Sequence, residues 1–120
     1  MTGHILVIDD NDDLRETVQM LLESSGYSVA TAANGRAAIA HLQGGSRPSL
    51  ILLDLMMPDM NGWQFLEHAR GDASLRSVPI LIMTAHQETD GARMPPAEVV
   101  PKPFDAATLL AAIGRHVSPI

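Results

Sequence analysis

The chain of 120 residues contains no cysteine. Disulfide bonds, a thiolate nucleophile and a zinc-thiolate site are therefore excluded, and the absence fits a reducing compartment. Basic residues are also scarce, because 8 Lys and Arg stand against 14 Asp and Glu, for a formal net charge of -6. Direct binding to nucleic acid needs clustered positive charge to neutralise phosphates, so this composition argues against it.

Long hydrophobic runs are absent as well. The first apolar stretch, 5–8, is too short for a signal-peptide core or a membrane span, and no basic segment precedes it. We therefore expect a cytoplasmic protein that makes no membrane contact. A hydrophobic share of 46% with 18% charged residues is typical of a folded protein. The length predicts one domain over 1–120, without an output domain.

Short apolar runs alternate with segments of helical periodicity along the chain. Consecutive apolar residues, typical of strands buried on both faces of a parallel sheet, occur at 5–8, 50–53, 80–83 and 99–100, with a weaker alternating run at 27–32. Helical spacing follows these runs from 12, 36, 62 and 105. Five strands alternating with helices predict an α/β sandwich in which helices cover both faces of a parallel sheet.

Two details of the helices are predicted from the same patterns. In the second helix, Ala37, Ile39 and Leu42 are expected to face the core. The segment 86–93 can form only a short helix, because the pair Pro95-Pro96 must end it.

Four of the apolar runs end on residues that can hold a metal or a phosphate. Asp9 and Asp10 follow the first run, Asp54 and Thr84 end the third and fourth, and Lys102 comes soon after the fifth. Because the carboxyl ends of parallel strands share one edge of the sheet, these groups are expected to meet there. That edge is where open α/β sheets bind ligands.

Three carboxylates at one edge repel each other unless a cation or a proton compensates them. A hard divalent ion, Mg²⁺ or Mn²⁺, suits such oxygen ligands. Asp54 ends the most apolar strand and is the best candidate for a nucleophile in phosphoryl transfer. Asp9 and Asp10 are adjacent, so in an extended chain their side chains diverge, and at most one reaches the metal directly unless the chain turns there.

These residues resemble those of the receiver domain of bacterial two-component response regulators, over essentially the whole chain. The most specific segment is 54–62, Asp-Leu-Met-Met-Pro-Asp-Met-Asn-Gly, and the second is Lys102-Pro103-Phe104. The resemblance implies a flavodoxin-like or CheY-like (βα)5 fold with the strand order 2-1-3-4-5. It also implies that the Lys102-Pro103 bond is cis.

The resemblance assigns a role to each residue of the predicted site. It implies that Asp54 accepts the phosphoryl group, that Thr84 and Lys102 contact it, and that Mg²⁺ is bound by Asp9, Asp10, Asp54 and the backbone carbonyl of Met56. The implied partners are a histidine kinase or histidine phosphotransfer protein as donor and an unknown downstream protein. Beyond its own phosphorylation and dephosphorylation, no enzymatic activity is expected.

Two departures from the family pattern concern the output side. Val99 stands three residues before Lys102, where the family usually has an aromatic residue or His. The segment between Thr84 and Lys102 is shorter than usual by about one helical turn. These features predict a shortened or irregular fourth helix. Because that helix belongs to the usual dimer face in the family, we expect a monomer or an unusual contact between copies.

Two other functions compete with the switch. The first is a pseudo-receiver, a constitutive interaction module that keeps the acids but is not phosphorylated. The second is a small phosphohydrolase of the haloacid-dehalogenase type, which needs an acid two residues after the nucleophile, where this chain has Met56. The histidines at 4, 41, 68, 86 and 116 show no paired ligand spacing and are interpreted as surface or capping residues.

Overall fold

A computed structural model of the chain describes residues 4–44, 47–54, 62–72, 75, 78–84, 98–101 and 105–117. The elements in chain order are β1 (Ile5–Ile8), α1 (Asp12–Ser24), β2 (Val29–Ala32), α2 (Gly35–Gln43), β3 (Leu50–Asp54), α3 (Gly62–Arg70), β4 (Ile80–Thr84), β5 (Glu98–Pro101) and α4 (Ala106–Gly114). The strands form one parallel sheet in the order β2-β1-β3-β4-β5, as predicted. The predicted short helix at 86–93 lies outside the described residues, so it stays a prediction.

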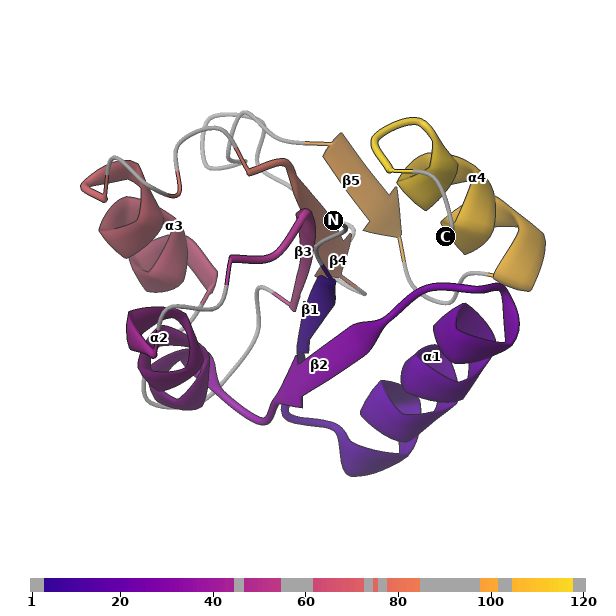
Figure 1. The fold of residues 1–120 in the computed structure, drawn as a ribbon, viewed down its shortest axis with the longest axis horizontal. Coiled ribbons are helices and arrows are strands. Elements are labelled where there is room, and N and C mark those ends of the chain that lie inside the picture. Colours follow the sequence, from indigo (N-terminus) through magenta and orange to yellow (C-terminus); the bar gives the residue numbers. More distant parts are fainter. Residues whose placement is uncertain are drawn as a thin grey trace.

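Helices cover both faces of the sheet. In Figure 1, α2 and α3 lie on one side of the sheet and α1 and α4 on the other. Each side has its own hydrophobic cluster. The first joins Leu6, Ile8, Ile51 and Leu53 of the strands to Ala38 of α2 and to Phe65, Leu66 and Ala69 of α3. The second joins Ile5, Val7, Leu50 and Leu52 to Val18 and Leu22 of α1 and to Leu109, Ala112 and Ile113 of α4.

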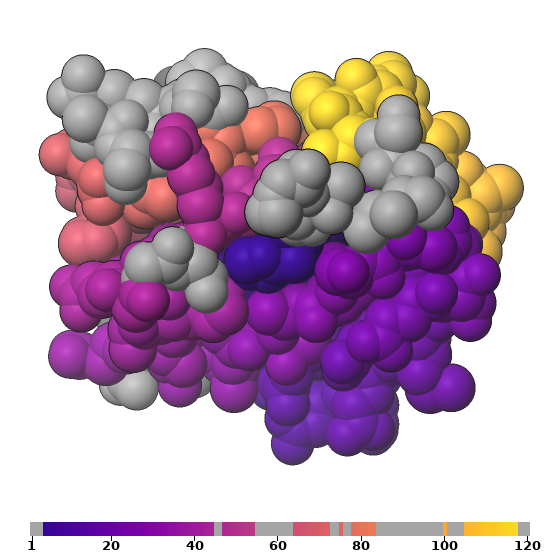
Figure 2. Space-filling view, in the orientation of Figure 1, coloured from indigo at the N-terminus to yellow at the C-terminus, as the bar shows by residue number. Residues whose placement is uncertain are grey.

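The alternation of strand residues between the two clusters explains why β1 and β3 are apolar at consecutive positions. A strand with helices on both faces must bury every side chain, whichever face it points to. All residues of both strands are buried. In Figure 2 only a small indigo patch at the start of the described chain reaches this face of the molecule, which agrees with the burial of β1. The prediction that 50–53 forms a central strand is confirmed.

Side-chain caps fix where three of the helices begin. Asn11 accepts from the backbone N–H of Leu14 at 3.1 Å, Asn34 from Ala37 at 2.8 Å, and Asp105 from Thr108 at 2.7 Å. Such caps satisfy backbone donors that have no partner within the first helical turn. Hydrogen bonds from the side chain and the backbone N–H of Thr108 lower the pKa of Asp105, because they favour its ionised form.

The prediction for the core side of α2 was wrong at one residue. Ala37 is exposed, whereas Ala38 is fully buried and belongs to the first hydrophobic cluster. The capped helix begins at Gly35, and the buried stripe follows from there at intervals of three and four residues through Ala38 to Ile39 and Leu42. Ala37 lies off that stripe.

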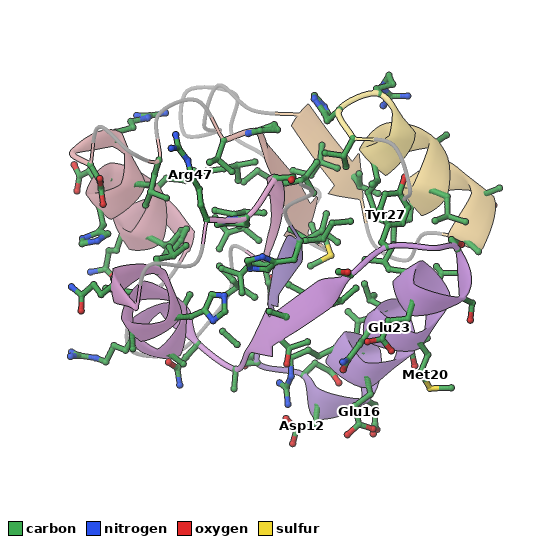
Figure 3. All side chains as sticks on the ribbon, viewed as in Figure 1. Asp12, Glu16, Met20, Glu23, Tyr27 and Arg47 are labelled. Carbon is green, nitrogen blue, oxygen red and sulfur yellow. The ribbon has the colours of Figure 1, made fainter. Side chains whose placement is uncertain are left out.

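The outer face of α1 is acidic. Asp12, Glu16 and Glu23 project from it into solvent in Figure 3, with Met20 between them. Met20 is 68% exposed and is the one large hydrophobic side chain that stands out as exposed in the described part of the chain.

Two of the histidines that were interpreted as surface or capping residues are only partly exposed and contact each other. The Nε2 atoms of His4, just before β1, and His41, in the last turn of α2, lie 3.0 Å apart in a partly buried hydrogen bond. Their rings meet edge to face, with centroids 5.1 Å apart. They are 37 positions apart in sequence, so only the packing of α2 against the start of the sheet brings them together.

The His4–His41 contact should make stability depend on pH. Burial and then the nearby His41 lower the pKa of His4 below its ordinary value of 6.5. The unfolded chain therefore binds more protons, so the stabilisation is present above pH 6.5 and is lost as the pH falls through the lowered pKa. The stability of the parent in urea should therefore fall between pH 7.5 and about 5.5, and replacing His4 by Gln should reduce this fall.

The matched control for this experiment is His68→Gln, which removes an exposed histidine from the last turn of α3. This variant should keep the pH dependence of the parent. An equal slope in His4→Gln and the parent protein would show that the His4–His41 contact does not contribute.

Candidate functional site

The register of the sheet brings two acidic residues to one edge. Ile8 of β1 is the partner of Leu53 of β3, so the next residues, Asp9 and Asp54, come level at the carboxyl ends of neighbouring strands. Asp9 is fully buried, and Asp54 is 4% exposed. On the other side of β3, Asp54 pairs with Met83, which places Thr84 one position further along β4.

The chain turns sharply after β1, and this turn was left open by the sequence. The backbone N–H of Asp9 still bonds to the carbonyl of Ala32 on the neighbouring strand, at 3.2 Å. Immediately afterwards, the N–H of Asn11 donates to the Asp9 carboxylate at 2.9 Å. The strand thus ends within two residues, and α1 begins at once, with Asn11 in an extended conformation as its cap.

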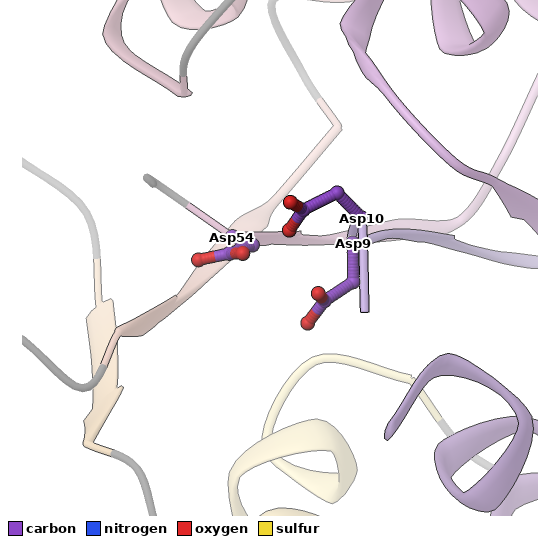
Figure 4. A group of neighbouring side chains, drawn as sticks. All are labelled: Asp9, Asp10 and Asp54. Atoms are coloured by element: carbon purple, nitrogen blue, oxygen red, sulfur yellow. The ribbon is translucent and has the colours of Figure 1, made fainter. Parts of the chain in front are cut away.

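As a result, Asp9 and Asp10 both face Asp54. One carboxylate oxygen from each of Asp9, Asp10 and Asp54 lies within 4.8 Å of the others, and we call these three residues the acid cluster. Figure 4 shows the three side chains close together, one from β3 and two from the end of β1. The sequence had allowed only one of Asp9 and Asp10 to approach a metal directly in an extended chain, and the turn removes that restriction.

The chemistry of the acid cluster suits a hard divalent cation. Three carboxylates this close repel strongly when all are ionised, and two of them are withdrawn from solvent. Mg²⁺ binds oxygen ligands, usually one or two carboxylates together with several waters, and the exposed side chain of Asp10 leaves the cluster open to solvent. The donor set therefore fits Mg²⁺.

The remaining predicted residues are placed only in part. Thr84 ends β4, where its backbone pairs with Pro101 of β5. Met56 and Lys102 lie outside the described residues, as does the Lys102-Pro103 bond. Their roles therefore stay predictions, although the ends of β3 and β5 bring the chain to the same edge of the sheet.

Sequence reasoning missed Arg15, in the first half of α1. Its guanidinium donates to the backbone carbonyl of Asp9 at 2.8 Å and to the carboxylate of Asp12 at 2.6 Å. The spacing of three residues between Asp12 and Arg15 was the available signal, since such pairs meet on a helix. That spacing does not reveal the bond to Asp9.

Comparison with known proteins identifies the family. The model of the response regulator receiver domain matches residues 5–114. The chain belongs to the response regulator receiver family. None of the helices in the described ranges of this receiver domain is long and apolar enough to cross a membrane.

Relatives of this receiver domain differ in how much of them it covers. It is 38% identical to response regulator Rre1 of Synechocystis in an alignment of 114 positions that covers 91% of the chain and 49% of Rre1. Over 115 residues it is 34% identical to PilH of Pseudomonas aeruginosa, covering 92% of the chain and 94% of PilH. The receiver domain thus spans about half of Rre1 and nearly all of PilH.

Solved structures show the same fold. The chemotaxis protein CheY4 of Vibrio cholerae superposes with a TM-score of 0.88 at 31% identity, over 98% of this chain and 100% of CheY4. Response regulator TrrA of Thermotoga maritima, solved in complex with Mg²⁺ and BeF, superposes with a TM-score of 0.84 at 26% identity, over 97% of this chain and 100% of TrrA. The CheY-like fold expected from the sequence is confirmed.

Proposed function

We propose that this receiver domain is a phosphorylation switch in which Asp54 accepts a phosphoryl group with Mg²⁺ in the acid cluster. The observation that carries the proposal is the convergence of Asp9, Asp10 and Asp54 within 4.8 Å at the carboxyl edge of the sheet. The complex of the related protein TrrA with Mg²⁺ and BeF supports the choice of metal.

Asp54 is the nucleophile in the proposed reaction. A carboxylate oxygen of Asp54 attacks the phosphorus of a phosphohistidine, a P–O bond forms, and the P–N bond breaks, with its electron pair returning to the imidazole. Asp9, Asp10 and Asp54, together with the backbone carbonyl of Met56, would hold the metal. When bound, Mg²⁺ neutralises negative charge on the transferring oxygens.

Lys102 and Thr84 complete the proposed site. The ammonium group of Lys102 pairs as a compact charge with Asp54 or with a phosphoryl oxygen, and the hydroxyl of Thr84 donates one hydrogen bond to the phosphoryl group. The dianionic aspartyl phosphate shifts the conformational equilibrium of the segments around it and so changes the surface offered to a partner.

The proposed partners are proteins. A histidine kinase or a histidine phosphotransfer protein supplies the phosphoryl group, and an unidentified protein reads the switched surface. We further propose that the domain acts as a cytoplasmic monomer and turns over no substrate except its own aspartyl phosphate. We propose no direct binding to nucleic acid, because a formal net charge of -6 would repel its phosphates.

The test is the mass of the intact protein after incubation with acetyl phosphate and Mg²⁺. We expect a gain of one phosphoryl group that disappears when Mg²⁺ is chelated and in the Asp54→Asn variant. The matched control is Asp13→Asn, an exposed acid in the first turn of α1, which should be phosphorylated like the parent.

Two other outcomes would contradict the switch. Mg²⁺ binding without phosphoryl uptake, from acetyl phosphate and from a kinase donor alike, would favour the pseudo-receiver. Steady turnover of an unrelated phosphate ester would favour the phosphohydrolase, for which Met56 stands where the second acid is needed.

A further inference from the structure

The turn that assembles the acid cluster has a second support besides its own backbone. Arg15 reaches back from α1, and its Nη1 donates to the carbonyl oxygen of Asp9 at 2.8 Å. Its Nη2 donates to the Asp12 carboxylate at 2.6 Å. The Arg15 side chain is 16% exposed, whereas that of Asp12 is 76% exposed. Arg15 is thus a largely buried residue whose two bonds join the end of β1 to the start of α1.

The bond from Arg15 to the Asp9 carbonyl matters because the turn holds carboxylates close together that repel each other. Asp10 is exposed, so its carboxylate could swing into solvent and away from Asp9 and Asp54. The peptide group that carries the Asp9 carbonyl also connects Asp9 to Asp10. Holding this carbonyl therefore limits the backbone rotation that would turn residue Asp10 as a whole out of the cluster.

We propose that Arg15 is a positioning residue that keeps Asp10 beside Asp9 and Asp54 and so sets the affinity of the acid cluster for Mg²⁺. This inference rests on the proposed function, since it concerns the same metal site. Arg15 is not a catalytic residue, because it acts through the backbone of Asp9. The planar fork of the guanidinium reaches two partners in fixed geometry, which a lysine ammonium on a flexible stem does not reproduce.

The positive charge of Arg15 has the opposite effect on metal binding, and this separates the two roles. A nearby cation repels Mg²⁺, so a purely electrostatic role predicts that Arg15→Gln binds Mg²⁺ more tightly and that Arg15→Lys binds it as the parent does. The positioning role predicts that both variants bind Mg²⁺ more weakly. Loss of an outer-shell partner of a metal site typically costs about 10–100-fold in affinity.

The experiment compares the parent with Arg15→Gln, Arg15→Lys and the matched control Arg70→Gln, which removes an exposed arginine at the end of α3. Isothermal titration calorimetry gives the Mg²⁺ dissociation constant of each unphosphorylated protein. NMR gives the solvent exchange of the Asn11 amide, which donates to the Asp9 carboxylate at 2.9 Å, in the absence of metal. The phosphorylation rate is then measured with acetyl phosphate at saturating Mg²⁺.

We expect the Mg²⁺ dissociation constant to rise about tenfold in Arg15→Gln and to rise also in Arg15→Lys. Exchange of the Asn11 amide should be faster in both variants. The phosphorylation rate at saturating Mg²⁺ should return close to that of the parent, because the metal then holds Asp10 in place. Because saturating Mg²⁺ also stabilises the folded state as a whole, urea unfolding of the metal-free variants separates positioning from general destabilisation.

The outcomes distinguish the two proposals. If the parent binds Mg²⁺ and takes up a phosphoryl group, but both Arg15 variants bind the metal as the parent does, the positioning role is wrong and the proposed function stands. Tighter Mg²⁺ binding by Arg15→Gln alone would likewise show that Arg15 acts on the metal only through its charge. A parent protein that binds no Mg²⁺ would overturn the proposed function and this inference together.

Discussion

Replacing Asp54 by Asn is expected to abolish phosphoryl uptake and, in the absence of metal, to make the protein more stable. The carboxylates of the acid cluster lie within 4.8 Å of one another, and Asp54 is buried at the end of β3. Coulomb repulsion between two charges at this distance is about 3 kcal/mol at an effective dielectric constant of about 20. Because Asp54 also gives up favourable contacts, we expect a net gain of on the order of 1 kcal/mol.

The stabilisation that Mg²⁺ provides should, by contrast, be smaller in the variant than in the parent. A metal that binds only the folded protein stabilises it by about 1.4 kcal/mol when its free concentration is ten times the dissociation constant. The Asp54→Asn variant, which has lost one charged ligand, should gain much less at the same concentration. Urea unfolding with and without Mg²⁺ measures both effects in one series.

The control is Glu16→Gln on the outer face of α1, which changes the net charge equally. It should change the metal-free stability by less than about 0.5 kcal/mol and leave the response to Mg²⁺ unchanged. A metal-free Asp54→Asn variant less stable than the parent would mean that Asp54 contributes more to the fold through its contacts than it costs through repulsion.

The architecture was predictable because hydrophobic pattern and topology decide it together. Runs such as 50–53 are short and apolar at every position, which favours a strand with helices on both faces, and the alternation of strands with helices then favours a parallel sheet. Once the sheet is parallel, Asp9 and Asp54 must reach the same edge. The shared position of Asp9 and Asp54 followed from the fold without any knowledge of side-chain geometry.

What the sequence analysis got wrong or missed concerns details of geometry that the hydrophobic pattern does not determine. The helical periodicity of α2 did not fix its phase, so Ala37 was placed in the core where Ala38 belongs. Whether Asp9 and Asp10 act together depended on a turn over two residues, which the sequence left open. The contact between His4 and His41 depends on how α2 packs against the sheet, and no local signal announces it.

Arg15 illustrates the same limit at the functional site. Its ion pair with Asp12 follows from helical spacing, but its bond to the carbonyl of Asp9 depends on where the strand stops and the helix starts. Sequence reasoning predicted which groups would touch a phosphoryl group or a metal. It did not identify the residue that holds one of those groups in position.

Replacing Phe65 by Ala is expected to be the most destabilising single substitution considered. Phe65 is fully buried in α3 and belongs to the first hydrophobic cluster with Leu6, Ile51 and Ile82. Truncating a buried phenylalanine typically costs about 3–5 kcal/mol, because apolar contact is lost and a cavity remains. A domain of this size is stable by about 5–15 kcal/mol in total, so the variant should unfold at a much lower urea concentration.

The matched control is Met20→Ala, which truncates a large side chain that is 68% exposed on α1. Its stability should stay within about 0.5 kcal/mol of the parent, because little apolar area is lost and Ala favours helix. Equal urea midpoints for Phe65→Ala and Met20→Ala would contradict the placement of Phe65 in the core.

The same substitution tests how far the core supports the site. Ile8 and Leu53, which share the cluster with Phe65, directly precede Asp9 and Asp54. Protein interiors are close-packed, so a cavity beside these strand ends should loosen the acid cluster as well. We therefore expect the folded fraction of Phe65→Ala to bind Mg²⁺ more weakly by calorimetry, whereas Met20→Ala should bind it as the parent does. Unchanged Mg²⁺ affinity in a destabilised Phe65→Ala would show that the hydrogen bonds of the β1–α1 turn hold the cluster without help from the core.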